Sequence, residues 1–339
     1  FCIYNIEKMN LTDLLNAIEK QRNIKPSTLK AYSNNIKKLT KDITNKEFSS
    51  INYLKDFKKI KDFLNKKTIS TRKNYIATIL VMLRAVNKDD KLDKLIDQYS
   101  DFLMDVNGEY EDKIKNQEKD QKTSENWMDL QDLRKKALKY YTKKIRDKGI
   151  NKKTKTKLSK KEKKILQAYL LVSLYLLDPN VPPRRNEYAG MKIIKSEDYA
   201  KLSDKEKNKF NWLWIKSRNR KKFIYNNQKN NKKNEVPITS SVNSVINLYL
   251  KYHDGEDFLL NSKNEGMKSN NLTKLLHKIF EKATGKHISS TMLRKIYVSH
   301  KFDLPKLKEL EETNKKMGHT STTMMKNYYK TDNEKKKSQ

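Results

Sequence analysis

The chain has 339 residues and a formal net charge of +35, and hydrophobic residues make up only 35% of it. This length predicts two domains, or one domain with an appendage. Glycine and proline are scarce, at 7 and 6 residues, and lysine is abundant, so the composition favours helices. The single cysteine, Cys2, excludes an internal disulfide, and the sequence contains no Cys/His spacing typical of a metal site.

The sequence shows neither a membrane anchor nor a secretory signal. The longest apolar stretch, residues 165–177, is shorter than the roughly 20 residues that cross a bilayer, and it is better explained as a buried helix. The start of the chain lacks the basic residues and the long apolar centre of a signal peptide. We therefore expect an intracellular protein.

The positive charge is the first indication of function. A surface this basic repels itself unless a polyanion is bound, and DNA, RNA or an anionic membrane would serve. A preference for Lys and Asn over Arg is also what an AT-rich genome would produce. The charge therefore favours nucleic-acid binding and leaves the activity open.

Residues 1–106 are predicted to form a helical domain. One helix is expected from Pro26 and another from Ser70, because apolar residues recur at helical spacing after each. These apolar positions are Leu29, Tyr32, Ile36 and Leu39 in the first helix and Ile76, Ile79, Leu80, Leu83 and Val86 in the second. Residues 107–125 are almost all polar or charged, which predicts an interdomain linker.

Residues 126–330 are predicted to form a second domain, followed by a disordered basic tail over residues 331–339. Two helices come first, and short stretches rich in β-forming residues follow. The predicted helices are 130–145, 160–177, 241–252, 272–283 and 291–300, with a last helical segment reaching Tyr329, and the predicted strands are 211–215, 222–225 and 236–238. The last two strands are joined by a polar hairpin. The predicted fold class is mainly α with a small antiparallel β-sheet.

The arginines of the second domain stand out because the chain uses lysine by default. In the segment VPPRRNEY, Arg184 is followed three residues later by Glu187. A guanidinium can bind two phosphate oxygens at once, which an ammonium cannot do. Taken alone, a surface Arg–Glu pair at a helix start explains this segment better.

Two further segments are weak individually. Arg294 lies on the amphipathic helix predicted for residues 291–300, where an exposed arginine is unremarkable in itself. Gly318-His319 marks a turn, and Tyr328 comes nine residues after His319. For the neighbouring Tyr329 we prefer the interpretation of an aromatic residue packed inward.

In combination, and with Lys229 seven residues before Val236, these residues resemble the tyrosine recombinase or phage integrase family. That family has an Arg followed by Glu, a hairpin Lys before a Val-Pro strand, an H-x-x-R box, a Gly-His turn and a Tyr nine residues later. The resemblance implies that the catalytic residues are Arg184, Lys229, Thr291, Arg294, His319 and Tyr328, with Tyr328 as the nucleophile.

The match has departures and alternatives. Thr291 stands where the family usually has His, and a threonine can donate a hydrogen bond to phosphate but cannot shuttle a proton near neutral pH. Lys295 stands where the family often has another His. Lys232 or Lys233 could take the place of Lys229, and Arg185 that of Arg184, although Glu187 favours Arg184.

The resemblance implies a site-specific recombinase or integrase that cuts and rejoins double-stranded DNA through a 3′-phosphotyrosyl intermediate. It implies a helical core-binding domain over residues 1–106, a homotetramer on DNA, and neither cofactor, metal nor small-molecule substrate. The PPRRNE segment and the Asn/Lys-rich hairpin look like those of integrase-like proteins of large DNA viruses, which predicts a viral or mobile element acting in the host nucleus or cytoplasm. The alternatives are a type IB topoisomerase and a catalytically inactive DNA-binding protein of the same fold.

Overall fold

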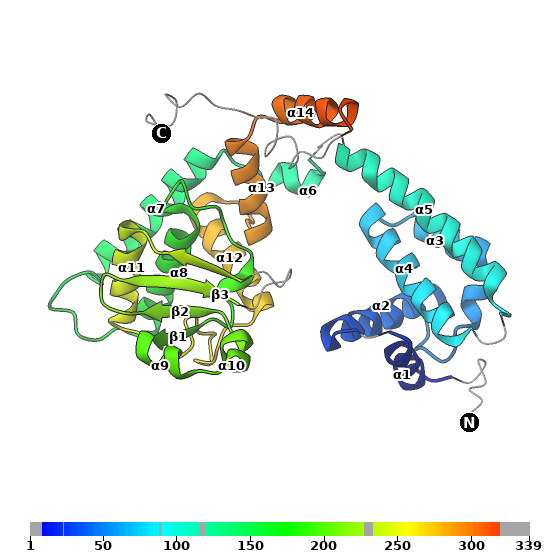
Figure 1. The fold of residues 1–339 in the computed structure, drawn as a ribbon, viewed down its shortest axis with the longest axis horizontal. Helices are drawn as coiled ribbons and strands as arrows, with labels where there is room; N and C mark the ends of the chain where they lie inside the picture. Colours follow the sequence, from blue (N-terminus) through cyan, green and yellow to red (C-terminus); the bar gives the residue numbers. More distant parts are fainter. Residues whose placement is uncertain (1–8, 23, 88–89, 116–118, 227–232, 319–339) are drawn as a thin grey trace. The chain divides into compact units, whose positions relative to one another are not determined.

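The computed structural model describes residues 9–22, 24–87, 90–115, 119–226 and 233–318 (Figure 1). The chain divides into two compact units, Phe1–Lys119 and Asp120–Gln339. Each unit buries a hydrophobic cluster of its own, so each is described by itself. The predicted last helical segment beyond Gly318 and the predicted tail, residues 331–339, lie outside the described residues.

The first unit is helical, as predicted, and is built around one buried helix. Its elements are α1 (Leu11–Gln21), α2 (Pro26–Thr44), the 3-10 turn η2 (Asn52–Lys55), α3 (Phe57–Asn65), α4 (Ile69–Val86) and α5 (Asp93–Lys115). Helix α4 contacts α1, α2, α3 and α5. The Thr68 side chain caps α4 by accepting a hydrogen bond from the Thr71 backbone N–H, and Pro26 stands in the first turn of α2.

Much of the segment predicted as a linker, residues 107–125, is helical. Helix α5 continues to Lys115, α6 spans Gln121–Glu125, and the boundary between the units falls between them. Polar contacts extend α5: Arg72 of α4 forms an ion pair with Glu109 at 3.1 Å, and the Lys73 ammonium lies 4.7 Å from the centre of the Tyr110 ring. Hydrophobic periodicity does not register such contacts, so the polar sequence suggested a linker there.

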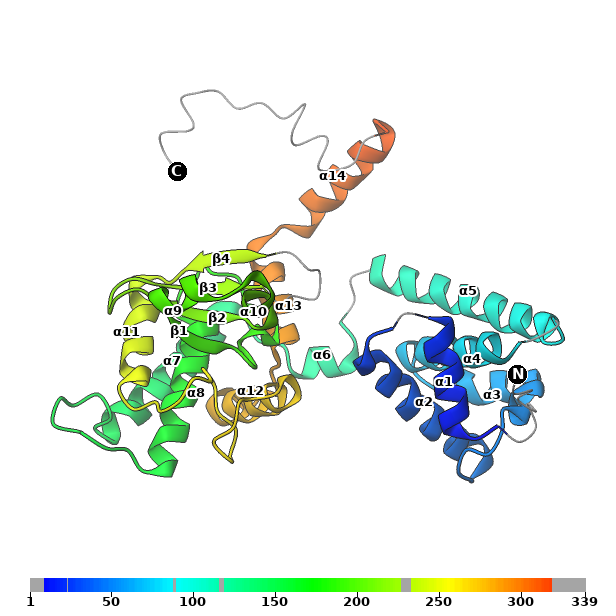
Figure 2. The ribbon, with the colours of Figure 1, turned by 60° about the horizontal axis from the view of Figure 1, so that its bottom comes forward.

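The second unit combines a set of helices with a small sheet at one side (Figures 1 and 2). Its helices are α7 (Leu130–Asp147), α8 (Lys160–Leu176), α9 (Ser196–Lys201), α10 (Asp204–Lys209), α11 (Ser240–Leu250), α12 (Ser269–Thr284), α13 (Ser290–Lys301) and α14 (Leu304–Lys316), with the 3-10 turn η3 (Asn186–Tyr188). Its strands are β1 (Lys192–Lys195), β2 (Trp212–Ile215), β3 (Lys221–Tyr225) and β4 (Asn234–Pro237). The prediction of a mainly helical protein with a small sheet is confirmed.

The strands lie side by side in the order β1-β2-β3-β4 (Figure 2). The three predicted strands form antiparallel pairs. A fourth strand, β1, which the sequence pattern does not predict, pairs parallel to β2 and makes the sheet mixed. Strand β1 is short, and its other edge is held by backbone hydrogen bonds from Ile193 N to Glu256 O and from Phe258 N to Met191 O. Tertiary contacts of this kind leave no local pattern in the sequence.

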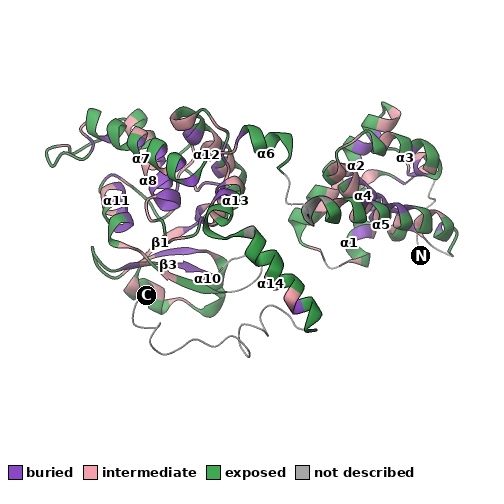
Figure 3. Cartoon of the chain, turned by 90° about the horizontal axis from the view of Figure 1, so that it is seen from above, coloured by how far each residue is buried: buried purple, intermediate pink, exposed green. Residues whose placement is uncertain are grey.

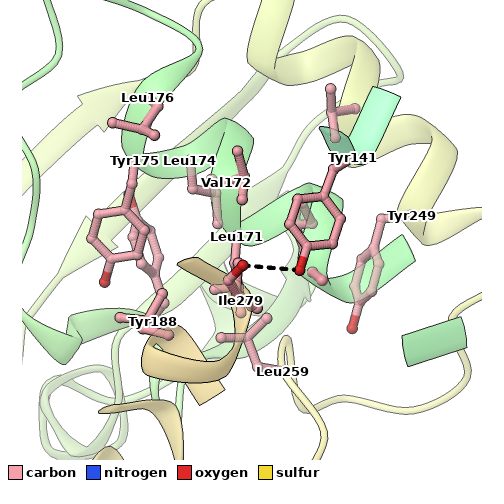
Figure 4. Packing of buried hydrophobic residues seen from close by; sticks show 14 of the residues in the cluster. Tyr141, Leu171, Val172, Leu174, Tyr175, Leu176, Tyr188, Tyr249, Leu259 and Ile279 are labelled. Atoms are coloured by element: carbon pink, nitrogen blue, oxygen red, sulfur yellow. Dashed lines mark hydrogen bonds between the residues drawn. The ribbon is translucent and has the colours of Figure 1, made fainter. Parts of the chain in front are cut away.

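Helix α8 forms the centre of the second core and contacts α7, α11 and α12. It begins with a capping box between Ser159 and Glu162, and residues 170–176 are all buried. Around it, buried tyrosines satisfy their hydroxyls on backbone carbonyls: Tyr141 donates to Ile279 O at 3.2 Å (Figure 4). Because α8 is packed at the centre of this core, its end is a fixed point from which the next loop leaves.

Neither α8 nor another helix of the described residues is long and apolar enough to cross a membrane.

Helix α14, by contrast, is mostly exposed (Figure 3). It ends at Lys316, and Gly318 follows it with φ +67°, the left-handed conformation that glycine adopts without strain. The predicted turn at Gly318-His319 is thus seen up to its glycine.

Leu171→Ala tests the separation of the two cores. Leu171 is fully buried, so truncation leaves a cavity and should lower the free energy of unfolding of the second unit by about 2–5 kcal/mol. The three tryptophans, Trp127, Trp212 and Trp214, all belong to this unit, so tryptophan fluorescence in a denaturant titration reports on it. Ile79→Ala, in the core of the first unit, is the control, and an equal shift by both variants would mean a single cooperative core.

Candidate active site

The loop that leaves α8 presents Arg184 in a half-buried position. The Arg184 guanidinium lies 3.6 Å from Glu187 Oε2, and it stacks over the ring of Tyr225 at 4.3 Å from the ring centre. Arg185, the alternative, is exposed, and its carbonyl accepts a hydrogen bond from the Tyr175 hydroxyl. The carboxylate and the ring fix the plane of the Arg184 guanidinium, as a side chain that binds two phosphate oxygens requires.

The wall behind Arg184 is aromatic and uncharged. Tyr188 packs edge-on against both Tyr175 and Tyr225. Burial raises the pKa of Tyr188 to about 12, although its hydrogen bond to Tyr225 and the charge of Arg184 act in the opposite direction. Burial likewise raises the pKa of Tyr225 and of Tyr175. These phenols stay neutral, so Glu187 is the negative group that faces Arg184 from this side.

The Glu187 carboxylate pairs with the Arg184 guanidinium. Its Oε2 is buried and accepts no hydrogen bond from the described residues, so the guanidinium is its source of compensation. One carboxylate at 3.6 Å occupies only part of a guanidinium that has five N–H donors. Arg184 therefore keeps donors available for an external anion.

Asn186 connects this loop to two helices. Its Nδ2 lies within hydrogen-bond distance of Ser269 O, Ser269 Oγ and Thr273 Oγ1 at the start of α12. Its Oδ1 accepts a hydrogen bond from Ser290 Oγ at 2.7 Å, at the start of α13. The residue two positions after Arg184 thus ties its loop to the N-termini of α12 and α13.

Helix α13 carries the two other described residues of the predicted site. Ser289 caps the helix by accepting a hydrogen bond from Met292 N, and Thr291 directly follows Ser290, the partner of Asn186. Thr291 is exposed, and Arg294 is partly buried three residues later, on the same face of the helix. The start of α13 also contributes the positive end of its helix dipole. The structure thus links Arg184, Thr291 and Arg294 through Asn186 and Ser290.

Three predicted residues, Lys229, His319 and Tyr328, lie outside the described residues. For Lys229, the strands on either side are known: β3 and β4 pair antiparallel, with Tyr225 opposite Asn234. The connection that contains Lys229 therefore starts beside the tyrosine on which Arg184 stacks. Within the described part of the chain, no group of three His, Cys, Asp or Glu side chains could hold a metal ion.

Sequence reasoning missed the residues that support the arginine. Asn186 lies within the RRNE motif. It positions the loop through hydrogen bonds to residues that are more than 80 positions away in the sequence. Tyr225 ends a strand that was predicted, and an aromatic residue at the start of the hairpin was the available signal. No periodic pattern in the sequence predicts the contacts of Asn186 or of Tyr225.

Comparisons with known proteins bear on the family of the chain. Residues 205–335 match the model described as Phage integrase family. The predicted residues within this stretch are Lys229, Thr291, Arg294, His319 and Tyr328, and Arg184 precedes it. No curated protein matches the chain in sequence.

Two solved structures resemble the chain over nearly its whole length. A XerA recombinase is 11% identical, with a TM-score of 0.31 and 97% of each chain covered. The XerH site-specific recombinase, in a pre-cleavage complex with its difH substrate, is 16% identical, with a TM-score of 0.43, covering 96% of this chain and 82% of that one. Likeness at this level gives no correspondence between individual residues. The sequence match is the finding that bears on the family: residues 205–335 of the chain are similar to the phage integrase, or tyrosine recombinase, family.

Proposed function

We propose that the protein is a site-specific DNA recombinase that cuts and rejoins one strand at a time, with Tyr328 as the nucleophile. The observation that carries the proposal is the half-buried Arg184, oriented by Glu187 and Tyr225 and linked through Asn186 to the helix of Arg294, in a chain of this family. The net charge of +35 supports double-stranded DNA as the substrate. A homotetramer on two duplexes, acting inside a cell, belongs to the same proposal.

The proposed reaction is a transesterification. The Tyr328 hydroxyl oxygen forms a bond to the phosphorus, the bond between phosphorus and the 5′-oxygen breaks, and a 3′-phosphotyrosine and a 5′-hydroxyl result. The tyrosine loses one proton and the leaving oxygen gains one. A second 5′-hydroxyl then reverses the step, and because each step exchanges one phosphate ester bond for another, no nucleotide is consumed.

The roles of the residues follow from charge. Arg184 and Arg294 bind the non-bridging oxygens and stabilise the charge that develops there. Lys229 protonates the leaving oxygen, a general-acid role typically worth about 10²–10⁴ in rate. His319 binds the phosphate or assists proton movement, and Thr291 donates a hydrogen bond to it. A tyrosine has an ordinary pKa of about 10, and nearby cations ease its ionisation.

One observation favours a second candidate, a DNA-binding protein of this fold without catalysis. Thr291, at an exposed position on α13, cannot shuttle a proton as the family's His does. Such a protein would bind duplexes and never form a covalent bond to them. The candidates therefore differ in one measurable product.

Tyr328→Phe should abolish a covalent DNA adduct while leaving DNA binding intact, because phenylalanine lacks the attacking oxygen. The adduct is detected as labelled DNA that stays with the protein after boiling in detergent. The substrates are nicked duplexes from the DNA around the source gene and from a random pool, without metal or nucleotide. Tyr329→Phe is the matched control and should keep the adduct.

The other outcomes are equally informative. Loss of the adduct only in Tyr329→Phe would keep the chemistry and move the nucleophile by one residue. No adduct on any duplex that the wild-type chain binds would favour the catalytically inactive protein.

Arg184→Lys should slow adduct formation by about 10²–10³, because lysine keeps the charge and loses the planar pair of donors. Arg185→Lys, one residue away and exposed, is the control and should change the rate little. Both rates are measured at saturating DNA, with binding measured separately. Equal effects of the two substitutions would contradict the role given to the Glu187 and Tyr225 contacts of Arg184.

DNA binding should weaken steeply with salt. Each phosphate that a lysine or arginine neutralises adds about 0.9 to the slope of log affinity against log salt concentration, and such contacts are insensitive to sequence. A filter-binding or anisotropy titration at several salt concentrations gives the slope. A flat dependence would contradict the assignment of the positive charge to DNA.

A further inference from the structure

Helix α5 has an acidic surface in a strongly basic chain. It carries seven carboxylates and three lysines, a net charge of −4, whereas the whole chain carries +35. Five of the carboxylates recur at every fourth position, and helical geometry places residues four apart on neighbouring turns of one face. This acidic stripe consists of Asp93, Asp97, Asp101, Asp105 and Glu109.

The described residues of the first unit supply no ion pair to the middle of the acidic stripe. Asp97, Asp101 and Asp105 are exposed, and none forms an ion pair with a side chain of the described residues. Met104 lies among them with 64% of its surface exposed, the largest value among the exposed large hydrophobic residues of the described chain. Such a face would repel phosphates, so it is unsuited to DNA. It is suited to a partner surface on which basic side chains surround apolar ones, because the apolar side chains can contact Met104.

The second unit contains a groove with the complementary properties. Its volume is about 730 Å³, and seven lysines and no carboxylate line it. These lysines are Lys144, Lys148, Lys161, Lys164, Lys274, Lys278 and Lys282. Apolar side chains, among them Ile165, Ala168 and Leu275, also line it. We call this the lysine groove.

The two surfaces match in spacing as well as in charge. On α12, Lys274, Lys278 and Lys282 are exposed and recur every four residues, the spacing of the three central aspartates of the acidic stripe. Helices rise about 1.5 Å per residue, so both rows repeat about every 6 Å and can pair charge by charge. A bound DNA backbone would need the lysines and would leave the apolar lining unused, whereas a helix with an exposed methionine uses both.

We propose that the acidic stripe of one copy of this chain docks in the lysine groove of a second copy. The contact joins two different surfaces, so it repeats head to tail, and in a closed ring each copy both gives a stripe and receives one. It goes beyond the proposed function and does not depend on cleavage, since neither surface contains a residue of the proposed active site. Copies bound to DNA hold each other through these two protein surfaces.

The test reverses charge on each surface in a Tyr328→Phe chain, which separates assembly from cleavage. Variant A carries Asp97→Lys, Asp101→Lys and Asp105→Lys, and variant B carries Lys274→Glu, Lys278→Glu and Lys282→Glu. The control carries Glu19→Lys, Glu47→Lys and Asp62→Lys, the same charge change at exposed positions elsewhere in the first unit. Sedimentation velocity at physiological salt, with and without a short duplex, gives the association state over a range of protein concentrations.

Each of A and B alone should associate at least about tenfold more weakly than the parent chain, because three attractive pairs become repulsive. An equimolar mixture of A and B should recover the parent's association, since each meets a partner of opposite charge, and the control should associate as the parent does.

Three results would overturn the proposal. A mixture of A and B that stays dissociated removes the pairing of these two surfaces. A parent chain that is monomeric both free and on the duplex removes the contact altogether. Loss of DNA binding by B, without recovery on adding A, would make the lysine groove a DNA surface instead.

Discussion

The arrangement of the candidate site depends on the side-chain amide of Asn186. An arginine on a loop can bind phosphate productively only if the loop has a fixed position relative to the other phosphate-binding groups. Asn186 fixes it by hydrogen bonds in two directions, to the first turn of α12 and to Ser290 of α13. Both helices pack in the core of the second unit through buried residues such as Leu276 and Leu293, so the loop takes its position from that core. The hydrogen bonds of Asn186 therefore fix the position of Arg184 relative to the packed core.

Most of the fold could be predicted because it rests on local pattern. The helices containing Ile79 and Leu171 have apolar residues at helical spacing, and the antiparallel strands have β-forming residues on both sides of a polar turn. Strand β1 and the continuation of α5 could not be predicted. The first depends on backbone bonds to residues 256–258, and the second on Arg72 and Tyr110, so each is stabilised by residues distant in sequence or by polar pairs.

The candidate site divides along the same line. The order of Arg184, Arg294 and the Gly-His turn along the chain is visible in the sequence, and the proposed chemistry rests on it. The groups that support Arg184, which are the Tyr225 ring and the Asn186 amide, cannot be identified from the sequence. Their contacts depend on how the chain folds and not on a fixed spacing along it. The choice between Arg184 and Arg185 shows the limit: Glu187 favours Arg184 on spacing, and the structure adds that Arg184 contacts Glu187 while Arg185 is exposed.

The support of Arg184 has a consequence for how the protein tolerates its surroundings. Contacts between exposed charges weaken as ions screen them, whereas a stack on an aromatic face and a pair with a largely buried carboxylate are screened much less. Arg184 is held by contacts of the second kind. Under the proposed function, DNA would be held by contacts of the first kind. Rising ionic strength would then release the DNA and leave the contacts of Arg184 in place, so a protein freed from DNA by salt would keep the arginine arrangement that the proposed reaction needs.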